Sequence, residues 1–255
     1  MRVVILGSGT STGVPVIGCS CSVCRSKEDR NKRTRSSIAL LDENGNWIVV
    51  DTTPEFRLQA LSAGINNLKY VIYTHLHADH CAGFDDLRAY SFTSQDVINC
   101  YLDSENKSEF LERFSYAFKD TGYIGMKPVV NLLEIPYSFF KVGALTIEPI
   151  RLPHGNLMTV GLKIGRFVYA TDFKTFPSDV MDRVTGNVDI MVASGIHFGS
   201  HLAHSVIPET IELFKKIGVK RGILTHLSHE VDYYRDCDKL PEFVEFAYDQ
   251  MVIDV

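Results

Sequence analysis

The chain has 255 residues, of which 45% are hydrophobic and 22% are charged, as is ordinary for a globular protein. Its formal net charge of −5 leaves no basic excess, which disfavours broad binding to nucleic acid. No apolar run reaches the roughly 18–20 residues of a membrane span, and the N-terminal run is too short for a signal peptide. We therefore expect a cytoplasmic protein without a membrane segment, folded as one domain over residues 1–255.

The N-terminal segment is predicted to be a strand over 2–6, followed by a glycine-rich turn from Gly7 to Gly13. A dinucleotide-binding fingerprint is disfavoured, because the third glycine lies one place late and Pro15 interrupts the expected helix. We interpret the glycines as positions where backbone approaches a site closely.

Three of the six cysteines form a C-x-C-x2-C cluster at 19–24, namely Cys19, Cys21 and Cys24. In a reducing compartment, close thiols suit a structural zinc site that takes its fourth ligand from elsewhere in the chain. The alternative is three free buried thiols. The remaining cysteines are interpreted as small buried or incidental residues. Most of the basic run at 30–35 is interpreted as a solvated loop, and the alternative is a place where one arginine meets an anionic substrate.

Expected strands and helices alternate along the rest of the chain, which favours an α/β sandwich. An Asn44-Gly45 turn predicts a hairpin, and Asp51 ends its second strand. Strands are expected at 37–41, 47–50, 69–74, 158–164, 167–171, 189–193, 221–225 and 251–255, with short strands between 129 and 151. Helices are expected at 54–64, about 81–90, 108–119, from a Ser205 cap to 216, and at 241–248.

The strand at 69–74 runs directly into His75, His77, Asp79 and His80. His75 and His77 lie two residues apart, so on an extended backbone they point to the same side. Imidazole and carboxylate are ligands of first-row divalent metals. Four ligands in one short turn exceed what one metal takes from consecutive residues, which indicates two metals. A histidine-rich surface loop is the disfavoured alternative.

Other polar residues also stand at expected strand ends. These are His154, Asp172 and His226. Each alone is typical of a structural residue, but strand ends along one edge of a sheet are where sites are assembled. Together with the histidine motif they predict one shared site.

The histidine motif, followed by His154, Asp172 and His226, resembles the metallo-β-lactamase superfamily across nearly the whole chain. Within it, three segments resemble the phosphoribosyl 1,2-cyclic phosphate phosphodiesterase family of the carbon–phosphorus lyase pathway. They are the glycine-rich turn, the cysteine cluster and the pair His226-x-x-His229. The resemblance implies an αββα four-layer sandwich with a dinuclear metal centre at one edge.

Carried over by position, the resemblance assigns His75, His77 and His154 to one metal. The second metal takes Asp79, His80 and His226, and Asp172 bridges the two. His229 completes a structural zinc site with Cys19, Cys21 and Cys24. The implied cofactors are two active-site metals, manganese or zinc with iron as a third choice, and one structural zinc.

The implied reaction is hydrolysis of a small cyclic phosphodiester at the two metals, with Asp79 among the catalytic residues. His204 is the candidate general acid, or stabilises charge in the transition state. Its alternative is a helix-start histidine without a chemical role. His197 and His201 are given at most supporting parts.

Two other functions remain open at this point. A nuclease of the same superfamily, for tRNA 3′ ends or as an exonuclease, is disfavoured because no basic arm is evident. A catalytically silent metal-binding protein is disfavoured by the complete ligand set. The resemblance makes a homodimer plausible as a partner arrangement, and residues 96–127 carry no recognised motif and are a candidate wall of the substrate site.

Overall fold

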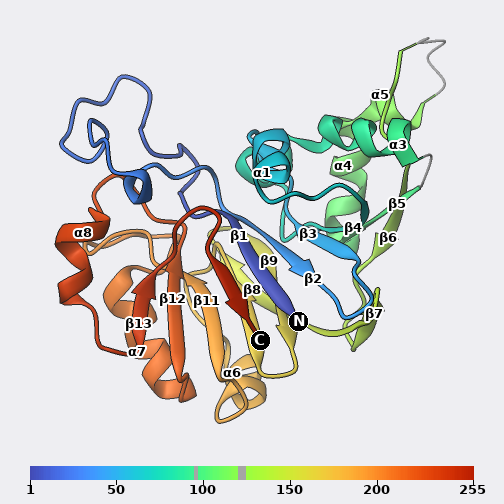
Figure 1. The fold of residues 1–255 in the computed structure, drawn as a ribbon. Helices are drawn as coiled ribbons and strands as arrows, with labels where there is room; N and C mark the ends of the chain where they lie inside the picture. The colour runs from blue at the N-terminus through green and yellow to red at the C-terminus, as the bar shows by residue number, and fades with distance from the viewer. Residues whose placement is uncertain (95–96, 120–124) are drawn as a thin grey trace.

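Two sheets of seven strands each lie at the centre of the fold (Figure 1). This computed structural model describes residues 1–94, 97–119 and 125–255. The first sheet has the order β14 (Val252–Asp254), β1 (Arg2–Gly7), β2 (Ser37–Leu41), β3 (Trp47–Val50), β4 (Leu68–Ile72), β5 (Ile98–Leu102) and β6 (Val130–Glu134). The second has the order β13 (Val244–Phe246), β12 (Arg221–Thr225), β11 (Ile190–Ser194), β10 (Phe167–Ala170), β9 (Leu157–Ile164), β8 (Leu145–His154) and β7 (Phe140–Val142).

The inner strands of both sheets are apolar on both faces, because both faces are covered there. In β1, Val3 and Ile5 join the core between the two sheets, whereas Val4 and Leu6 join the core beneath the helices of the first sheet. Successive strand residues point to opposite faces, so this split follows from the period of two. Continuous apolar strands are typical of sheets buried on both sides.

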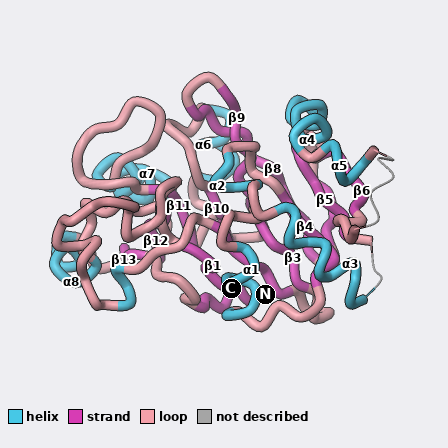
Figure 2. The backbone as a smooth tube through the Cα atoms, turned by 90° about the horizontal axis from the view of Figure 1, so that it is seen from above, coloured by secondary structure: helices cyan, strands magenta, loops and turns pink. Residues whose placement is uncertain are grey.

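Helices cover the outer face of each sheet and complete four layers (Figure 2). Beside the first sheet lie α1 (Phe56–Ser62), α2 (Ala78–Cys81), α3 (Arg88–Ser94), α4 (Lys107–Arg113) and α5 (Ser115–Phe118). Beside the second lie α6 (Ser178–Val184), α7 (Ile207–Ile217) and α8 (Tyr233–Asp236). Short 3-10 turns occupy η1 (Asp29–Asn31), η2 (Phe84–Leu87), η3 (Ser104–Asn106) and η4 (Cys237–Lys239). The αββα sandwich expected from the sequence is confirmed.

The parallel parts of both sheets point their carboxyl ends toward one edge of the sandwich. In the first sheet, β3 and β4 are parallel neighbours, and in the second β10, β11 and β12 are parallel. Asp51, His75, Asp172 and His226 follow β3, β4, β10 and β12. The topology therefore gathers polar side chains from distant segments at this edge.

The final helix expected at 241–248 is wrong. The segment contains β13, which pairs in parallel with β12, with Gly222 opposite Val244 and Leu224 opposite Phe246. Val244 and Phe246 are buried while Glu245 between them is only half-buried. A short alternating segment beside an unpaired strand edge gains ladder hydrogen bonds there, which overrides its helix propensity.

Two further helix predictions need correction. α7 begins at Ile207, and the Ser205 hydroxyl does not cap it but lies 2.8 Å from the Thr210 hydroxyl. The helix expected at 108–119 is broken at Phe114, whose φ of −108° and ψ of 32° are not helical. Phe114 instead packs its ring 4.6 Å from Phe84. Residues 120–124, part of the region left without a motif, lie outside the described residues.

The glycine-rich turn approaches the chain at 33–35 very closely. A Cβ atom on Gly7 would lie 2.0 Å from the Arg35 carbonyl oxygen, and one on Gly9 would lie 2.9 Å from the Arg33 carbonyl oxygen. The turn also pairs with Leu227, next to His226, through hydrogen bonds of 2.9 and 3.2 Å. Only glycine allows this contact, so the turn serves backbone packing beside the site.

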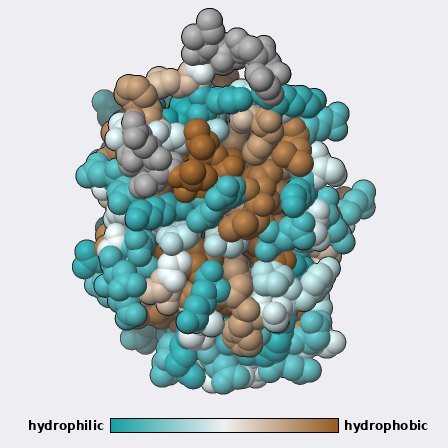
Figure 3. All heavy atoms as spheres, turned by 90° about the vertical axis from the view of Figure 1, so that its right-hand side faces the viewer, coloured by the Kyte–Doolittle hydropathy of each residue, from teal (hydrophilic) through white to brown (hydrophobic). Residues whose placement is uncertain are grey.

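The surface at the right of Figure 1 carries a group of hydrophobic residues (Figure 3). Exposed apolar side chains there include Phe92 on α3 and Leu133 on β6, the edge strand of the first sheet. Among the described residues, no helix has both the length and the hydrophobicity that a membrane crossing requires.

Candidate metal centre

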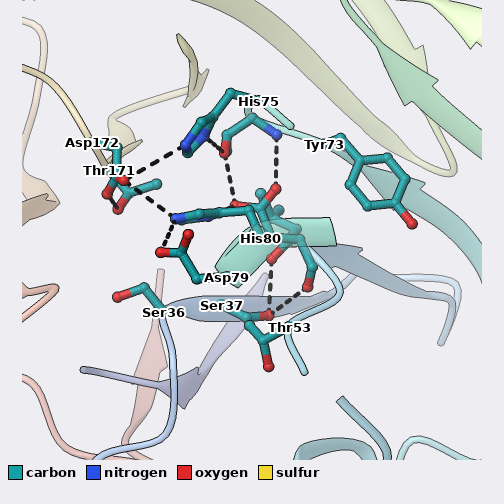
Figure 4. A network of polar contacts seen from close by, with 12 residues as sticks. Ser36, Ser37, Thr53, Tyr73, His75, Asp79, His80, Thr171 and Asp172 are labelled. Carbon is teal, nitrogen blue, oxygen red and sulfur yellow. Dashed lines mark hydrogen bonds and ion pairs between the residues drawn. The ribbon is translucent and has the colours of Figure 1, made fainter. Parts of the chain in front are cut away.

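The segment after β4 changes direction in a way that separates its four polar side chains. His77 is still extended, with φ −61° and ψ 148°, and α2 begins at the next residue. His75 and His77 therefore project from the extended part, while Asp79 and His80 project from one helical turn. Figure 4 shows the His80 ring beside the carboxylates of Asp79 and Asp172, with His75 on its other side.

The first group of candidate ligands consists of His75, His77, His154 and Asp172. The ring centres of the three histidines lie 4.6 to 5.5 Å apart, and the rings meet edge-on. Asp172 Oδ2 lies 3.6 Å from His75 Nε2 and 3.8 Å from His154 Nε2. One ligand atom from each residue lies within 4.8 Å of the others.

The second group consists of Asp79, His80, His226 and the same Asp172. His80 Nε2 lies 3.2 Å from Asp79 Oδ2 and 3.3 Å from Asp172 Oδ2. His226 Nε2 lies 3.0 Å from Asp172 Oδ1. Asp172 thus belongs to both groups, and its two oxygens face different histidines.

The donor set fits a pair of divalent cations. The Nε2 atoms of His75, His80 and His226 are buried and have no hydrogen-bond partner of suitable geometry among the described residues. Buried polar atoms are rarely left in that state, because each loses its hydration without compensation. Imidazole nitrogens and carboxylates that converge in this way form the ligand type of zinc, manganese and iron sites.

Asp51 supports both groups, although the sequence pattern does not mark it as a site residue. Its carboxylate accepts hydrogen bonds from the Thr74 backbone N–H and hydroxyl, each at 2.8 Å, and lies 2.7 Å from His80 Nδ1. The Thr74 hydroxyl also lies 3.0 Å from His75 Nδ1. A carboxylate behind a ligand histidine fixes the ring and its tautomer, so that Nε2 faces the metal. The one signal in the sequence was an aspartate at a strand end.

His154 is fixed by a backbone contact instead. Its Nδ1 lies 3.2 Å from the carbonyl oxygen of Ala203, in the loop that also carries His204. Donation from Nδ1 leaves Nε2 free to face Asp172. The loop between β11 and α7 therefore helps to orient a residue of the first group.

Three site residues that are not glycine have a left-handed backbone. The φ angles are 69° for Asp51, 51° for Asp172 and 57° for His226. Such conformations are uncommon for residues with a side chain and cluster at functional sites. Asp51 and His226 directly follow β3 and β12, and Asp172 lies two residues after the end of β10. At each position the sharp turn directs the side chain into the centre.

Burial and charge set the protonation of the centre. Burial would raise the pKa of the Asp172 carboxyl, but the charges of His226 and His80 outweigh burial and hold this pKa well below its ordinary value. Burial lowers the pKa of His75 well below its ordinary value. An ionised carboxylate and a neutral imidazole are the forms that bind metals.

The ring of His204 lies close to residues of both ligand groups. Its ring centre lies 4.6 Å from that of His154, and 5.1 Å from that of His226 in a stacked arrangement. Its Nδ1 is buried without a hydrogen-bond partner among the described residues. Burial lowers the pKa of His204 to about 3, so the ring is neutral in the structure.

The other histidines of this loop shape it. His201 is exposed, and its Nδ1 accepts hydrogen bonds from the backbone N–H groups of Ala203 and His204. His197 Nδ1 accepts one from the backbone N–H of Gly199 at 3.0 Å. Both use a ring nitrogen to hold the loop that presents His204, in line with the supporting parts expected for them.

The structure brings the cysteine cluster together with His229, the residue that the family resemblance implies as its fourth ligand. The Sγ atoms of Cys19, Cys21 and Cys24 lie 3.3, 3.5 and 3.6 Å from His229 Nδ1. A hydrogen bond from the Cys24 backbone N–H is the main cause that lowers the pKa of Cys21 to about 6, and burial raises that of Cys24 to about 11. Three thiols and one imidazole fit a closed structural zinc site. The scattered cysteines Cys81 and Cys100 are buried and Cys237 is exposed.

Comparisons with known proteins agree with this fold. The sequence profile described as "Beta-lactamase superfamily domain" matches residues 46–227. The chain belongs to this superfamily. Among solved structures, a diphosphatase of the PhnP family superposes with a TM-score of 0.91 at 29% identity, covering 100% of this chain and 97% of that one. Zinc-bound PqqB of Methylobacterium extorquens has a TM-score of 0.78 at 20% identity, with 100% of both chains covered.

Among curated sequences, an octanoyltransferase of Porphyromonas gingivalis is 36% identical over 259 residues, which covers 100% of this chain and 52% of that protein. Coenzyme PQQ synthesis protein B of Methylobacterium radiotolerans is 36% identical over 101 residues, covering 34% of each protein. The chain thus spans about half the length of the octanoyltransferase, and its match to the PQQ synthesis protein covers about a third of either protein. Human short-form tRNase Z shares the fold, with a TM-score of 0.71 at 19% identity over 100% of this chain and 99% of that one.

Proposed function

We propose that this chain is a metal-dependent hydrolase of small phosphodiesters. The observation that carries the proposal is the sharing of Asp172 between two ligand groups, with His204 facing both. The likeness to a PhnP-family diphosphatase supports phosphorus chemistry. Two divalent cations held there would supply Lewis-acid polarisation of a phosphoryl oxygen and a nucleophilic water near neutral pH.

The residues of the chain perform the remaining tasks. Asp172 and Asp79 provide negative charge that holds the cations, and Asp51 keeps the His80 ring in the tautomer that presents Nε2. His75 and His154 are held by Thr74 and by the Ala203 carbonyl. Their fixed positions would hold a cation in the first group with little reorganisation during the reaction.

His204 is proposed to act on the leaving group. Its ring is close to both ligand groups, and its buried Nδ1 has no partner among the described residues. A phosphodiester anion beside the ring favours its protonated form, from which it can donate a proton to the departing alkoxide oxygen. A neutral ring can still donate one hydrogen bond to the same oxygen.

The structural neighbour favours a second substrate of the same chemical class. This neighbour is a diphosphatase, and cleavage of a substituted diphosphate also displaces an oxygen from phosphorus. A tRNA precursor is the third candidate, because short-form tRNase Z shares the fold. The chain's net charge of −5 argues against a broad polyanion surface.

One observation favours a different reaction class. The octanoyltransferase relative covers the whole of this chain, and that protein is about twice as long. An octanoyl thioester is therefore a required substrate in the test, as the representative of acyl chemistry.

The deciding experiment compares four substrates on protein loaded with manganese or zinc. They are a ribose cyclic phosphodiester, a substituted diphosphate, a tRNA precursor and an octanoyl thioester. We expect turnover of one of the first two that tolerates added salt and falls in His204→Ala. Turnover of the thioester alone, or of tRNA alone with a steep salt dependence, would overturn the proposal.

We also propose a homodimer and a cytoplasmic location. Leu133 is an exposed apolar residue of β6, which ends the first sheet among the described residues, and Phe92 on α3 is also exposed. Exposed apolar side chains and sheet edges favour association. Light scattering on the purified chain tests the dimer, with Leu133→Lys expected to yield monomers. Free thiols that face a histidine suit a reducing compartment.

A further inference from the structure

Arg33 is the largest side chain that the fold buries almost completely, with 2% of its surface exposed. One amino group of its guanidinium donates to the Ser228 carbonyl oxygen at 3.1 Å. The other donates to the Val231 carbonyl oxygen at 2.9 Å and to Asn31 Oδ1 at 3.2 Å. Burying a charged group is costly, so an arginine with these neutral partners calls for a reason.

The carbonyl groups of Ser228 and Val231, which accept from Arg33, lie on either side of His229 in the sequence. Ser228 precedes this histidine and Val231 lies two residues beyond it, so one planar guanidinium spans the turn that presents the fourth ligand of the cysteine cluster. Arginine's donors have a fixed fork geometry, which can hold two acceptors at a set separation. A lysine ammonium has no such fork.

The backbone of Arg33 connects to the cysteine loop. Arg33 and Val14 exchange two hydrogen bonds of 2.8 Å, and the Val16 N–H donates to Cys24 Sγ at 3.3 Å. Asn31, which accepts from the guanidinium, also accepts from the Tyr233 N–H at 2.8 Å. Arg33 therefore joins both halves of the cysteine–histidine cluster.

The turn at 228–231 begins two residues after His226, a residue of the metal centre. Leu227 donates to the Ser8 carbonyl oxygen, and Ser228 donates to the Ile196 carbonyl oxygen, each at 2.9 Å. His226, with its left-handed backbone, immediately precedes these anchors. A shift of the turn at 228–231 would therefore reach a ligand of the second metal group.

The charge of the guanidinium is compensated by carboxylates, because Asp249, Asp232 and Asp236 raise the pKa of Arg33 against the effect of burial. The cysteine cluster is a further source of negative charge. Three thiolates outweigh one divalent cation, so a metal-loaded cluster with neutral His229 carries a net negative charge. Burial lowers the pKa of Arg33 to about 10, which leaves the group protonated at neutral pH. The protonated guanidinium binds the turn that carries His229, so its positive charge partly compensates the half-buried anionic cluster.

We propose that Arg33 is a positioning residue that holds the turn at 228–231, so that His229 completes the cysteine metal site and His226 keeps its place in the metal centre. The inference goes beyond the proposed phosphodiesterase activity, since it concerns coupling between two metal sites. It predicts that loading the cysteine site strengthens metal binding at the centre.

The test uses Co²⁺ as the probe, because its thiolate charge-transfer absorption reports the cysteine site alone. Arg33→Lys retains the charge without the fork, and Arg33→Met removes both. Lys32→Met is the matched control, since Lys32 is the neighbouring cation and its side chain is exposed. Titration against a chelator gives the Co²⁺ affinity, and metal analysis gives the loading of the centre.

We expect Arg33→Lys to bind Co²⁺ at the cysteines about tenfold or more weakly, in the range of other residues that support ligands. Loading of the centre should then no longer depend on the cysteine site, while Lys32→Met behaves as wild type. Wild-type Co²⁺ affinity and spectrum in Arg33→Lys would overturn the proposal. Should both Arg33 variants fail to fold, Asn31→Ala decides, because it removes one acceptor of the guanidinium: weaker Co²⁺ binding supports the proposal and unchanged binding rejects it.

Discussion

The metal centre and the cysteine cluster are built in opposite ways. Ligands of the centre such as His75 and Asp172 follow strands of two different sheets and are 1% exposed. The cysteines lie on an irregular loop and are half-buried. The sheets thus organise the centre before any metal arrives, whereas the cluster depends on tethers such as Arg33 and on the metal itself.

The largest effect is expected from the residue shared by both ligand groups. Asp172→Asn removes a negative charge that faces His75, His80 and His226. We expect loss of metal from the centre and a fall in turnover of more than about a thousandfold. The cysteine site should keep its metal. Metal analysis with Asp254→Asn as an exposed control checks this, and full metal content with full turnover would show that Asp172 is not a ligand.

A variant of His204 should change turnover without changing metal binding. His204→Ala should lower turnover by about a hundredfold, the usual contribution of a general acid, while the metal content stays unchanged. His201→Ala is the matched control, because His201 holds the same loop from an exposed position. Equal losses in both variants would assign His204 to loop structure. A leaving group of low pKa should reduce the effect of His204→Ala if the residue protonates it.

Variants at Asp51 and Thr74 test how far the sheets alone organise the metal centre. Asp51→Asn should weaken metal binding by about 10- to 100-fold, because His80 loses the carboxylate that fixes its tautomer. Thr74→Val, which removes one hydroxyl between Asp51 and His75, should give a smaller loss in the same direction. Chelator competition measures both. If Asp51→Asn binds metal as tightly as wild type, packing suffices without this support.

The smallest effect is expected from Asp236 on α8, and it concerns the free energy of unfolding. Hydrogen bonds from Arg235 are the main cause that lowers the pKa of the buried Asp236, and Lys239 adds to it. A depressed carboxyl pKa stabilises the fold above the ordinary value of about 4, and this contribution is lost as the pH falls through the folded-state pKa. Asp236→Asn should therefore lower the free energy of unfolding by about 1 kcal/mol at pH 7.

The pH dependence makes that prediction testable. The difference between wild type and Asp236→Asn, measured by urea unfolding, should be constant from pH 7 to about 5 and shrink in acid. A difference that grows as the pH falls would contradict the linkage. Arg2→Met, at an exposed ion pair, should change stability little at any pH.

The candidate ligands could be named from the sequence because they lie at strand ends and in one contiguous motif. A residue such as Asp172 is visible where an apolar strand stops, and topology brings it to His75 without any local signal. Asp51 occupies the same kind of position and was missed as a site residue, because its role depends on a hydrogen bond to His80 across the sheet. Arg33 was interpreted as part of a solvated loop for the same reason.

The errors in secondary structure have one common cause. The segment 241–248 has helix propensity, but the open edge of β12 captures Val244 and Phe246 as a strand. Phe114 breaks a helical pattern because its ring packs on Phe84. Local patterns predict elements well where the core face is continuous, and fail where a distant neighbour supplies a better contact.

The left-handed backbones of Asp51, Asp172 and His226 have a consequence for evolution in the laboratory. Each costs of order 1 kcal/mol relative to a relaxed conformation, and glycine would adopt it freely. Selection for heat resistance alone should therefore admit glycine at these positions and lose the centre. Selection for activity should hold them and gather stabilising substitutions elsewhere in the chain.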